Sequence, residues 1–537
     1  MPFLLLAALL LVPTVACGGG RRPLASPTAA PTPSPPAADV PLDLDLADKL
    51  LHDGDVERAL AIYNAVAKSS QGEGAEWRRA VQSAARVHYR QGRPDAVEGT
   101  LTALLDEDPP AEERQRALLL LGAARQEAGR TDAARDALAE YVEAGGVAAG
   151  HARLRLAAAL TAGSEDAAAV EELQLALADD LPPPQETGAL FALARGLEAT
   201  GRHADALAAW QRAAGDGATP NQRGEALWLL ANLALRLGDD QRYQDALVTL
   251  VRDYPWHDRA LEALGQQQLA LNTIDRAVVL FNHGDDDLAS AAFEAVLDQD
   301  TSALGQARAR YYLALLAERG DRNDEALAQY DAALAPILIG GLEGERLYGE
   351  AAWERALLLE TVGRTDEAVA AYAALAAAPP RSQRAAEALF RAGFLRFREG
   401  SPGEAAAHWT GYLELADAEG AARARFWLAK AALATGDAAA ADVHLRAAAT
   451  ASPWDYYGLR AAALLAGEPP LALTEPAPDI PDADWPAVEA WLTTWAGPED
   501  AAQRRALTEG LPWQRGLALL QAGLRQEAED QFADLIN

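Results

Sequence analysis

The chain has 537 residues, of which 50% are hydrophobic and 23% are charged. Its 79 acidic and 47 basic side chains give a formal net charge of −32, which argues against nucleic acid as a partner, because that binding needs Lys and Arg to neutralise phosphates. The single cysteine, Cys17, excludes an internal disulfide and a cysteine-based zinc site. The length fits about three domains or one long repetitive array.

The first predicted element is a signal peptide over residues 1–16. Its apolar run, residues 3–12, is too short to span a bilayer, which needs about 20 apolar residues. Residues 14–17, Thr-Val-Ala-Cys, precede three glycines and resemble a bacterial lipobox, in which the cysteine becomes the lipidated first residue. We therefore expect an extracytoplasmic lipoprotein of the bacterial cell envelope or periplasm, anchored to a membrane through Cys17. The alternative is an ordinary secretory signal with an incidental cysteine.

A linker follows over residues 17–41. It is rich in Pro, Ala, Ser and Thr and carries few side chains that could build a core. We expect a disordered, semi-extended tether that holds the folded part of the protein away from the membrane surface.

From residue 42 onward, an Ala- and Leu-rich helical pattern is interrupted by regularly spaced glycines. A small residue follows each glycine after five positions, and a large apolar residue follows after nine. These offsets recur at Gly54/Ala59/Tyr63, Gly129/Ala134/Leu138, Gly201/Ala206/Trp210, Gly284/Ala289/Phe293, Gly363/Ala368/Tyr372, Gly400/Ala405/Trp409, Gly436/Ala441/Leu445 and Gly523/Ala528/Phe532. Gly92 and Gly238 fit with a larger fifth residue, while Gly163 and Gly320 fit with a one-residue shift. Successive turn glycines from Gly54 to Gly436 lie 34 to 46 residues apart, most of them 36 to 38, and this period near 37 is typical of a helix-turn-helix repeat.

Each recurring offset has a physical reason. The glycine permits a positive-φ turn that closes the first helix of a repeat. The small residue lets the two helices approach, and the large residue one turn later fills the groove between them. Alternating β-branched runs, which would indicate strands, are absent. The sequence therefore predicts an all-α helix-turn-helix solenoid over residues 42–455.

The repeat units resemble the tetratricopeptide repeat. Residues 54–63 read Gly-Asp-x-x-x-Ala-Leu-x-x-Tyr, which is close to that family's pattern, and most later units are degenerate versions of it. The resemblance implies a superhelix with a long concave groove, because each repeat buries its face only against its neighbours.

A second resemblance concerns the C-terminal part of the chain. Residues 386–400, 424–437 and 452–467 contain, in order, a Phe-rich helix, a Phe-Trp helix with a Gly turn, and a Tyr-Tyr-Gly helix. This succession resembles the superhelical region of soluble lytic murein transglycosylases, and residues 456–537 resemble the helices that precede the catalytic domain. The family's Glu-Ser and Gly-Leu-Met-Gln motifs are absent, so no catalytic residue is assigned. Activity would need a domain after residue 537, and we expect a truncated protein rather than natural loss.

The densest aromatic group supplies the candidate binding residues: Trp454, Tyr456, Tyr457, Trp491 and Trp495. Their rings could stack on the sugars of a glycan strand. They could also fill the core of an Ala-rich scaffold, which is the interpretation we favour. The eight histidines are scattered without a His-x-x-x-His motif, and we expect no metal and no cofactor.

Two functions remain open. The first is a transglycosylase-like scaffold whose groove binds peptidoglycan in cell-wall turnover. The second is a non-enzymatic scaffold that holds protein partners in its groove during assembly of envelope complexes. The acidic surface argues mildly against tight binding to an anionic wall polymer.

Overall fold

The computed structural model describes residues 42–70, 72–179, 181–215, 217–266, 271–300, 302–334, 341–378, 382–468 and 509–535. These residues form helices and turns and contain no strand. The predicted all-α solenoid is therefore confirmed. The predicted signal peptide and tether lie outside the described residues, as do Cys17, Trp491 and Trp495. Among the described helices, none combines the length and the apolar character needed to cross a membrane.

The chain divides into two compact units, residues 1–117 and 118–537. The described helices of the first unit, the last of which continues into the second unit, are α1 (Leu44–His52), α2 (Val56–Ser69), α3 (Gly74–Arg90), α4 (Pro94–Asp106) and α5 (Ala111–Glu127). The next helices of the second unit are α6 (Thr131–Glu143), α7 (Ala149–Ala162), α8 (Asp166–Ala176), α9 (Pro183–Ala199), α10 (His203–Ala213), α11 (Pro220–Leu237), α12 (Asp240–Asp253), α13 (Asp258–Leu264), α14 (Thr273–Asn282) and α15 (Asp286–Gln299). They are followed by α16 (Ala303–Arg319), α17 (Asn323–Leu334), α18 (Gly341–Thr361), α19 (Thr365–Ala377), α20 (Ala385–Arg398), α21 (Pro402–Leu413), α22 (Ala418–Ala434), α23 (Ala438–Ala451), α24 (Tyr456–Leu465), α26 (Leu511–Ala522) and α27 (Arg525–Asp534).

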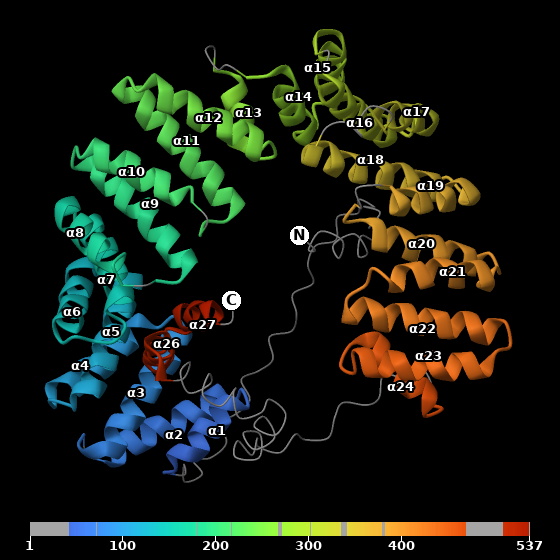
Figure 1. Ribbon diagram of the computed structural model, residues 1–537. Helices are drawn as coiled ribbons and strands as arrows, with labels where there is room; N and C mark the ends of the chain where they lie inside the picture. The colour runs from blue at the N-terminus through green and yellow to red at the C-terminus, as the bar shows by residue number, and fades with distance from the viewer. Residues whose placement is uncertain are drawn as a thin grey trace, which may run out of the picture. The chain divides into compact units, whose positions relative to one another are not determined.

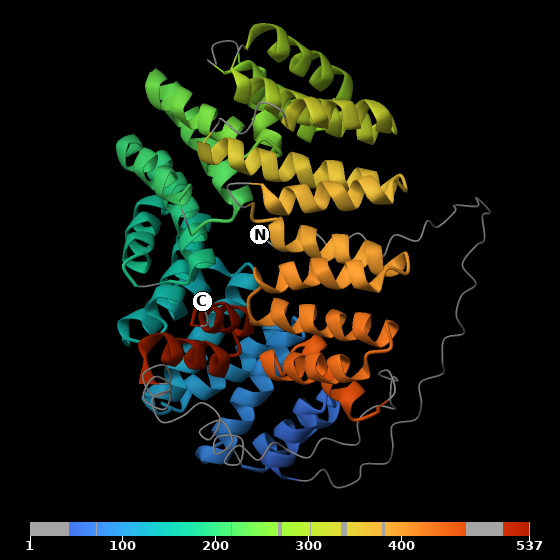
Figure 2. The ribbon, with the colours of Figure 1, turned by 45° about the vertical axis from the view of Figure 1, so that its right-hand side comes forward.

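Within the second unit, helices pack against their neighbours in chain order, so that each repeat contributes a first and a second helix (Figure 1). From α14 to α24 the even-numbered helices are the first helices of their repeats. They also contact one another across repeats, for example α14 with α16 and α22 with α24. Figure 2 shows α18 to α23 stacked in chain order. We call the surface formed by α18, α20, α22 and α24 the first-helix layer.

The turn between the two helices of a repeat adopts the backbone conformation that the glycine pattern predicts. Positive φ occurs at Gly54, Gly92, Gly129, Gly201, Gly238, Gly284, Gly363, Gly400, Gly436 and Gly523. Gly163 and Gly320 have negative φ. The following residues, Ser164 and Asp321, take the positive values of 62° and 56° instead. The predicted one-residue shift in these two repeats is thus confirmed.

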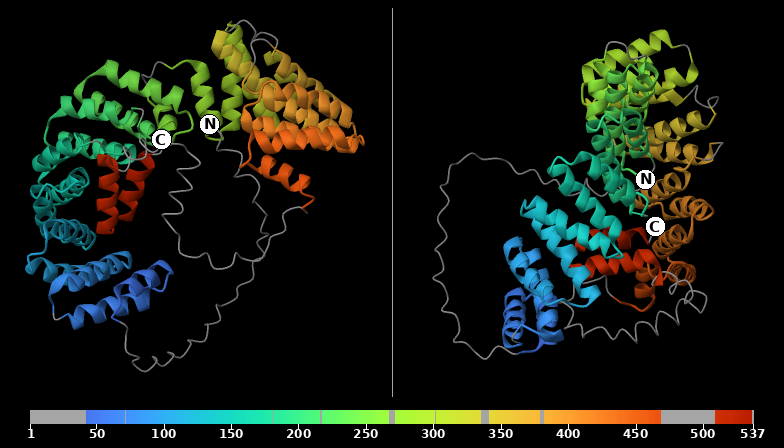
Figure 3. Two further views of the ribbon diagram at one scale, coloured as in Figure 1. Left: turned by 60° about the horizontal axis from the view of Figure 1, so that its bottom comes forward. Right: turned by 90° about the vertical axis from the view of Figure 1, so that its left-hand side faces the viewer.

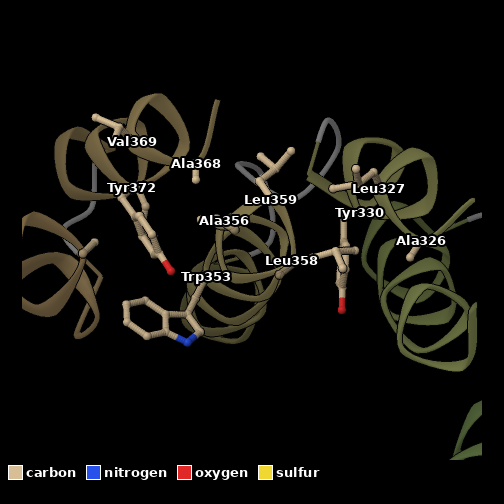
Figure 4. Close-up of a cluster of buried hydrophobic side chains, with 14 of the residues drawn as sticks. Ala326, Leu327, Tyr330, Trp353, Ala356, Leu358, Leu359, Ala368, Val369 and Tyr372 are labelled. Atoms are coloured by element: carbon tan, nitrogen blue, oxygen red, sulfur yellow. The ribbon is translucent and has the colours of Figure 1, made fainter. Parts of the chain in front are cut away.

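The large residue nine positions after the glycine fills the space between helices. Tyr63, Leu138, Trp210, Phe293, Tyr372 and Trp409 are all fully buried. In the cluster around α17 to α19, the ring of Trp353 lies 5.4 Å from that of Tyr372 (Figure 4). The buried Tyr372 hydroxyl donates to Glu360 at 3.0 Å, which satisfies its hydrogen-bonding capacity. The core of this repeat is therefore apolar, with the Tyr372 hydroxyl directed towards α18.

Candidate functional site

The structure separates the three predicted aromatic residues that it describes. Trp454 is 74% exposed and Tyr456 is 62% exposed, so the core-filling interpretation is wrong for both. Tyr457 is half-buried in α24, and its ring lies 5.6 Å from that of Phe426 and 5.1 Å from that of Tyr456. The difference follows from helix geometry, because Trp454 precedes α24 and Tyr456 is its first residue, whereas Tyr457 faces α22.

Tyr457 also lines a cavity of about 300 Å³ in the first-helix layer. The other lining residues come from α18, α20 and α22, and the complete set is Glu360, Glu387, Phe390, Arg391, Phe394, Arg423, Trp427 and Tyr457. We call this cavity the first-helix pocket. Four successive repeats contribute to it, so its shape depends on how these repeats stack.

Two ion pairs set the spacing of the helices around the pocket. Arg391 on α20 donates to both carboxylate oxygens of Glu360 on α18, at 2.9 and 3.0 Å. Arg423 on α22 donates to both oxygens of Glu387 on α20, at 2.9 and 3.1 Å. Two parallel hydrogen bonds fix the orientation of a guanidinium as well as its distance. Each pair therefore ties one first helix to the next.

The electrostatics of the pocket follow from these pairs. Burial lowers the pKa of the Arg423 guanidinium, but its hydrogen bonds to Glu387 and the charge of that carboxylate outweigh burial, so the pKa is raised overall. The pKa of Arg391 is raised by Glu360 in the same way, against the effect of burial. Both arginines stay charged and both are neutralised by a partner. The four charged side chains of the pocket therefore add little net charge to it.

Aromatic rings form the remaining wall. The guanidinium carbon of Arg423 lies 3.4 Å from the ring centre of Phe390. The ring of Trp427 lies 5.4 Å from that of Phe394 at 88°, and 5.4 Å from that of Trp409. Phe394 remains 38% exposed, so one apolar face is open to a ligand.

Two donors in the pocket lining lack an acceptor. Among the described residues, neither Trp427 Nε1 nor Arg423 Nε has a hydrogen-bond partner, although both atoms are buried. Buried donors are normally satisfied by protein or by a bound group. The pocket can therefore receive an apolar side chain against the exposed ring of Phe394, and the residues that carry these two unsatisfied donors line it. Its two carboxylates are both paired with arginines, so the arrangement is suited to binding.

A second cavity of about 370 Å³ lies between α10, α11 and α12. Two of its charged lining residues are already paired with each other. Asp239 accepts from the Arg242 backbone N–H at 3.1 Å and forms an ion pair with the Arg242 side chain at 2.7 Å. These contacts cap α12. The polar groups of this cavity thus stabilise a helix terminus, and the first-helix pocket is the stronger candidate.

Sequence reasoning identified Tyr457 but missed the other pocket residues. A signal was present in the spacing of opposite charges. Glu360 and Arg391 are 31 residues apart, and Glu387 and Arg423 are 36 residues apart. Both separations are close to one repeat, which places the pair at similar positions of adjacent first helices.

Comparisons with known proteins agree with the repeat pattern. A tetratricopeptide-repeat family model matches residues 83–149 and 274–337, and a second such model matches residues 225–255. These three segments therefore match the tetratricopeptide repeat. Neither matching model describes a transglycosylase, so that relationship stays a prediction. No curated protein matches the chain.

Similar solved structures include further repeat proteins. The Naa15/Naa10 complex bound to HypK-THB is 16% identical, with 91% of this chain and 77% of that chain covered and a TM-score of 0.30. YrrB, described as a TPR protein with an unusual peptide-binding site, is 19% identical, with 38% and 98% covered and a TM-score of 0.27. The C-terminal part of a TPR protein from Cytophaga hutchinsonii is 13% identical, with 50% and 98% covered and a TM-score of 0.31.

Proposed function

We propose that this tetratricopeptide-repeat protein is a scaffold that binds a protein partner through the first-helix pocket. The observation that carries the proposal is the buried, unpaired Trp427 Nε1 in a cavity with an exposed apolar wall. Stacked helical repeats offer long surfaces for extended segments of other proteins. A pocket that combines one apolar wall with a few placed donors is typical of such a recognition site.

The pocket suggests the chemistry of the partner segment. An aromatic or long aliphatic side chain would pack on Phe394, where it would remove apolar surface from water. A backbone carbonyl or a carboxylate beside that side chain would accept from Trp427 Nε1. The paired arginines would contribute shape and planar surface, because Glu360 already binds Nε and Nη2 of Arg391 and Glu387 already binds both Nη atoms of Arg423.

A displayed library of random peptides, selected on the full chain, tests this function. We expect enriched peptides to share an aromatic or long aliphatic residue. Trp427→Phe keeps a ring in place but removes the N–H donor, and it should weaken binding about fivefold, the value of one hydrogen bond. Phe394→Ala should weaken binding at least as much, because it removes the exposed wall.

The matched control for the peptide selection is Val443→Ala. Val443 is 63% exposed on α23, outside the pocket lining, so its loss should leave binding unchanged. Peptides that bind the Trp427→Phe and Phe394→Ala variants as tightly as the original chain would contradict the proposed site.

We further propose that the protein acts in the bacterial cell envelope, anchored by a lipid on Cys17. The lipobox-like residues 14–17 and the Pro-rich residues 17–41 support this location. Metabolic labelling with a fatty-acid analogue should label the chain, and Cys17→Ala should abolish the label. Equal labelling of both would contradict the anchor.

A glycan strand of peptidoglycan is a second candidate ligand, as the resemblance to transglycosylase superhelices implies. It is favoured by the exposed rings of Trp454 and Tyr456, the second of which lies 5.1 Å from the ring of the pocket residue Tyr457. Retention on purified sacculi at physiological salt, lost in the double variant Trp454→Ala/Tyr456→Ala, would support it. Absence of retention would leave the protein partner as the ligand.

A further inference from the structure

The C-terminal helix pair α26–α27 contacts helices that are distant in sequence. It lies beside α7 and α9 within the second unit (Figure 1, Figure 3). Arg155 on α7 forms an ion pair with Glu527 on α27, 372 residues away. Gln185 Nε2 on α9 donates to Asp530 Oδ2 on α27 at 3.2 Å. Both contacts join polar side chains, in contrast to the apolar packing within the repeats.

The interface buries polar groups. His151 on α7 is 4% exposed, Arg515 on α26 is 6% exposed and Gln531 on α27 is 1% exposed. Within the described residues, neither ring nitrogen of His151 has a hydrogen-bond partner, and the same holds for Gln185 Oε1 and Gln531 Oε1. Buried groups that lack partners oppose the contact. The polar contacts of the pair therefore form at the expense of burying unsatisfied groups. This desolvation cost weakens the docking and favours a reversible contact.

The helices beneath the pair are first helices of their repeats, because the turns at residues 163–164 and 201 follow α7 and α9. They belong to the same class of helix that lines the first-helix pocket. The surface on α7 and α9 is separate from that pocket, so docking of α26–α27 is independent of what the pocket binds.

We propose that α26–α27 is an internal ligand of the α7–α9 surface, and that an acidic amphipathic helix of a partner protein displaces it. The partner helix should resemble α27, the helix whose acidic side chain pairs with the surface. Over residues 525–534, α27 carries four acidic side chains and one basic side chain. One of the acids, Glu527, pairs with Arg155, which is the basic group that the surface offers to α27.

The pKa of His151 adds a dependence on pH. Burial is the main cause that lowers this pKa to about 4; the charges of Arg515 on α26 and Arg155 on α7 act in the same direction, while the Glu527 charge on α27 and the Gln185 side chain partly oppose them. Arg515 in turn lies 3.8 Å from Asp179, between α8 and α9. The docked pair thus requires a neutral His151, and protonation favours its release.

Charge reversal tests the docking. In the full chain, Arg155→Glu and Glu527→Arg should each release the pair, because each places like charges together. Hydrogen exchange in α26 and α27 should become about tenfold faster in each single variant. The double variant Arg155→Glu/Glu527→Arg should restore slow exchange. Arg446→Glu is the matched control, since it breaks a surface pair with Asp442 on α23. Unchanged exchange in both single variants would overturn the docking.

A labelled synthetic peptide of residues 509–535 tests the ligand role and stands for the external acidic helix. We expect it to bind the full chain carrying Glu527→Arg about tenfold more tightly than the original chain, whose surface is occupied. It should not bind the Arg155→Glu variant. Equal binding to the original chain and to the Glu527→Arg variant would overturn the proposal, as would no binding to the latter. Binding to the first-helix pocket is measured separately, so its failure would leave this result intact.

Discussion

Two repeats close their first helix with a residue other than glycine at the positive-φ position, namely Ser164 and Asp321. The left-handed conformation costs a residue with a Cβ about 1 kcal/mol. Ser164→Gly and Asp321→Gly should therefore each raise the free energy of unfolding by about 0.5–1 kcal/mol. Thermal denaturation followed by circular dichroism measures the change.

The control for these two variants is Gly129→Ala, in a repeat whose glycine has a φ of 71°. It should lower the free energy of unfolding by about 1 kcal/mol. A lowered melting temperature for both Ser164→Gly and Asp321→Gly would show that the strain is not relieved at this position.

The pH dependence of α26–α27 docking is set by His151. Its pKa is about 4 in the docked state against an ordinary value of 6.5. The contribution of a neutral His151 is fully present above pH 6.5 and is lost as the pH falls towards 4. Exchange in α26, corrected for the intrinsic pH dependence of exchange, should accelerate by up to about tenfold per pH unit in this window.

His151→Gln provides the control, because glutamine does not titrate. The variant should remove the acceleration that appears as the pH falls from 6.5 towards 4. Persistence of the full acceleration in His151→Gln would contradict the role of His151.

Among the individual residues of the first-helix pocket, only some could be predicted from the sequence. Tyr457 was identifiable because it lies in a dense aromatic group, but Trp454 and Tyr456 in the same group proved exposed. Trp427 was named only within a family resemblance, since its role depends on the neighbours that α20 supplies. Which ring faces a pocket is decided by packing between repeats, and one residue along a helix changes the face by about 100°.

Close approach of helices within a repeat depends on glycines outside the turns as well. A Cβ on Gly393 of α20 would lie 2.5 Å from Nε1 of Trp409, a fully buried ring on α21. Gly393→Ala should therefore displace the indole, whose Nε1 donates to the Phe390 carbonyl at 3.2 Å. We expect the free energy of unfolding to fall by about 1–3 kcal/mol in urea denaturation.

Gly403→Ala on α21 is the matched control for the change at Gly393. A Cβ on Gly403 would contact nothing within 4 Å, and the position is helical. It should raise the free energy of unfolding by about 0.5–1 kcal/mol. Equal destabilisation by both substitutions would mean that loss of the glycine, and not the contact with Trp409, is responsible.

The helices themselves were largely predictable, because the glycine spacing marks each turn between them. The irregular repeats were not. Gly238 and Gly284 are farther apart than the usual period, and the structure places the short helix α13 (Asp258–Leu264) between them. A longer interval between turns does not reveal whether it contains a loop, an extra helix or a longer helix, since all three satisfy the same spacing.

Within the second unit, first helices form both of the surfaces that we propose for binding: the pocket on α18 to α24 and the face of α7 and α9 that α26–α27 contacts. The repeat pattern predicts that such a layer exists, because second helices lie on the other side of each pair. It does not predict a contact between residues 372 positions apart. Such a contact leaves no periodic signal in the chain.

Site-specific photocrosslinking in cells that express the full chain would show whether the first-helix pocket holds a protein partner. A photoreactive residue is placed at Phe394 in the first-helix pocket or at Val443, which is exposed on the second helix α23. If the pocket binds a protein partner, a defined protein adduct should form from position 394, it should be lost when Trp427→Phe is added, and no such adduct should form from position 443. The same adduct from both positions, or an adduct from position 443 alone, would contradict binding in the pocket.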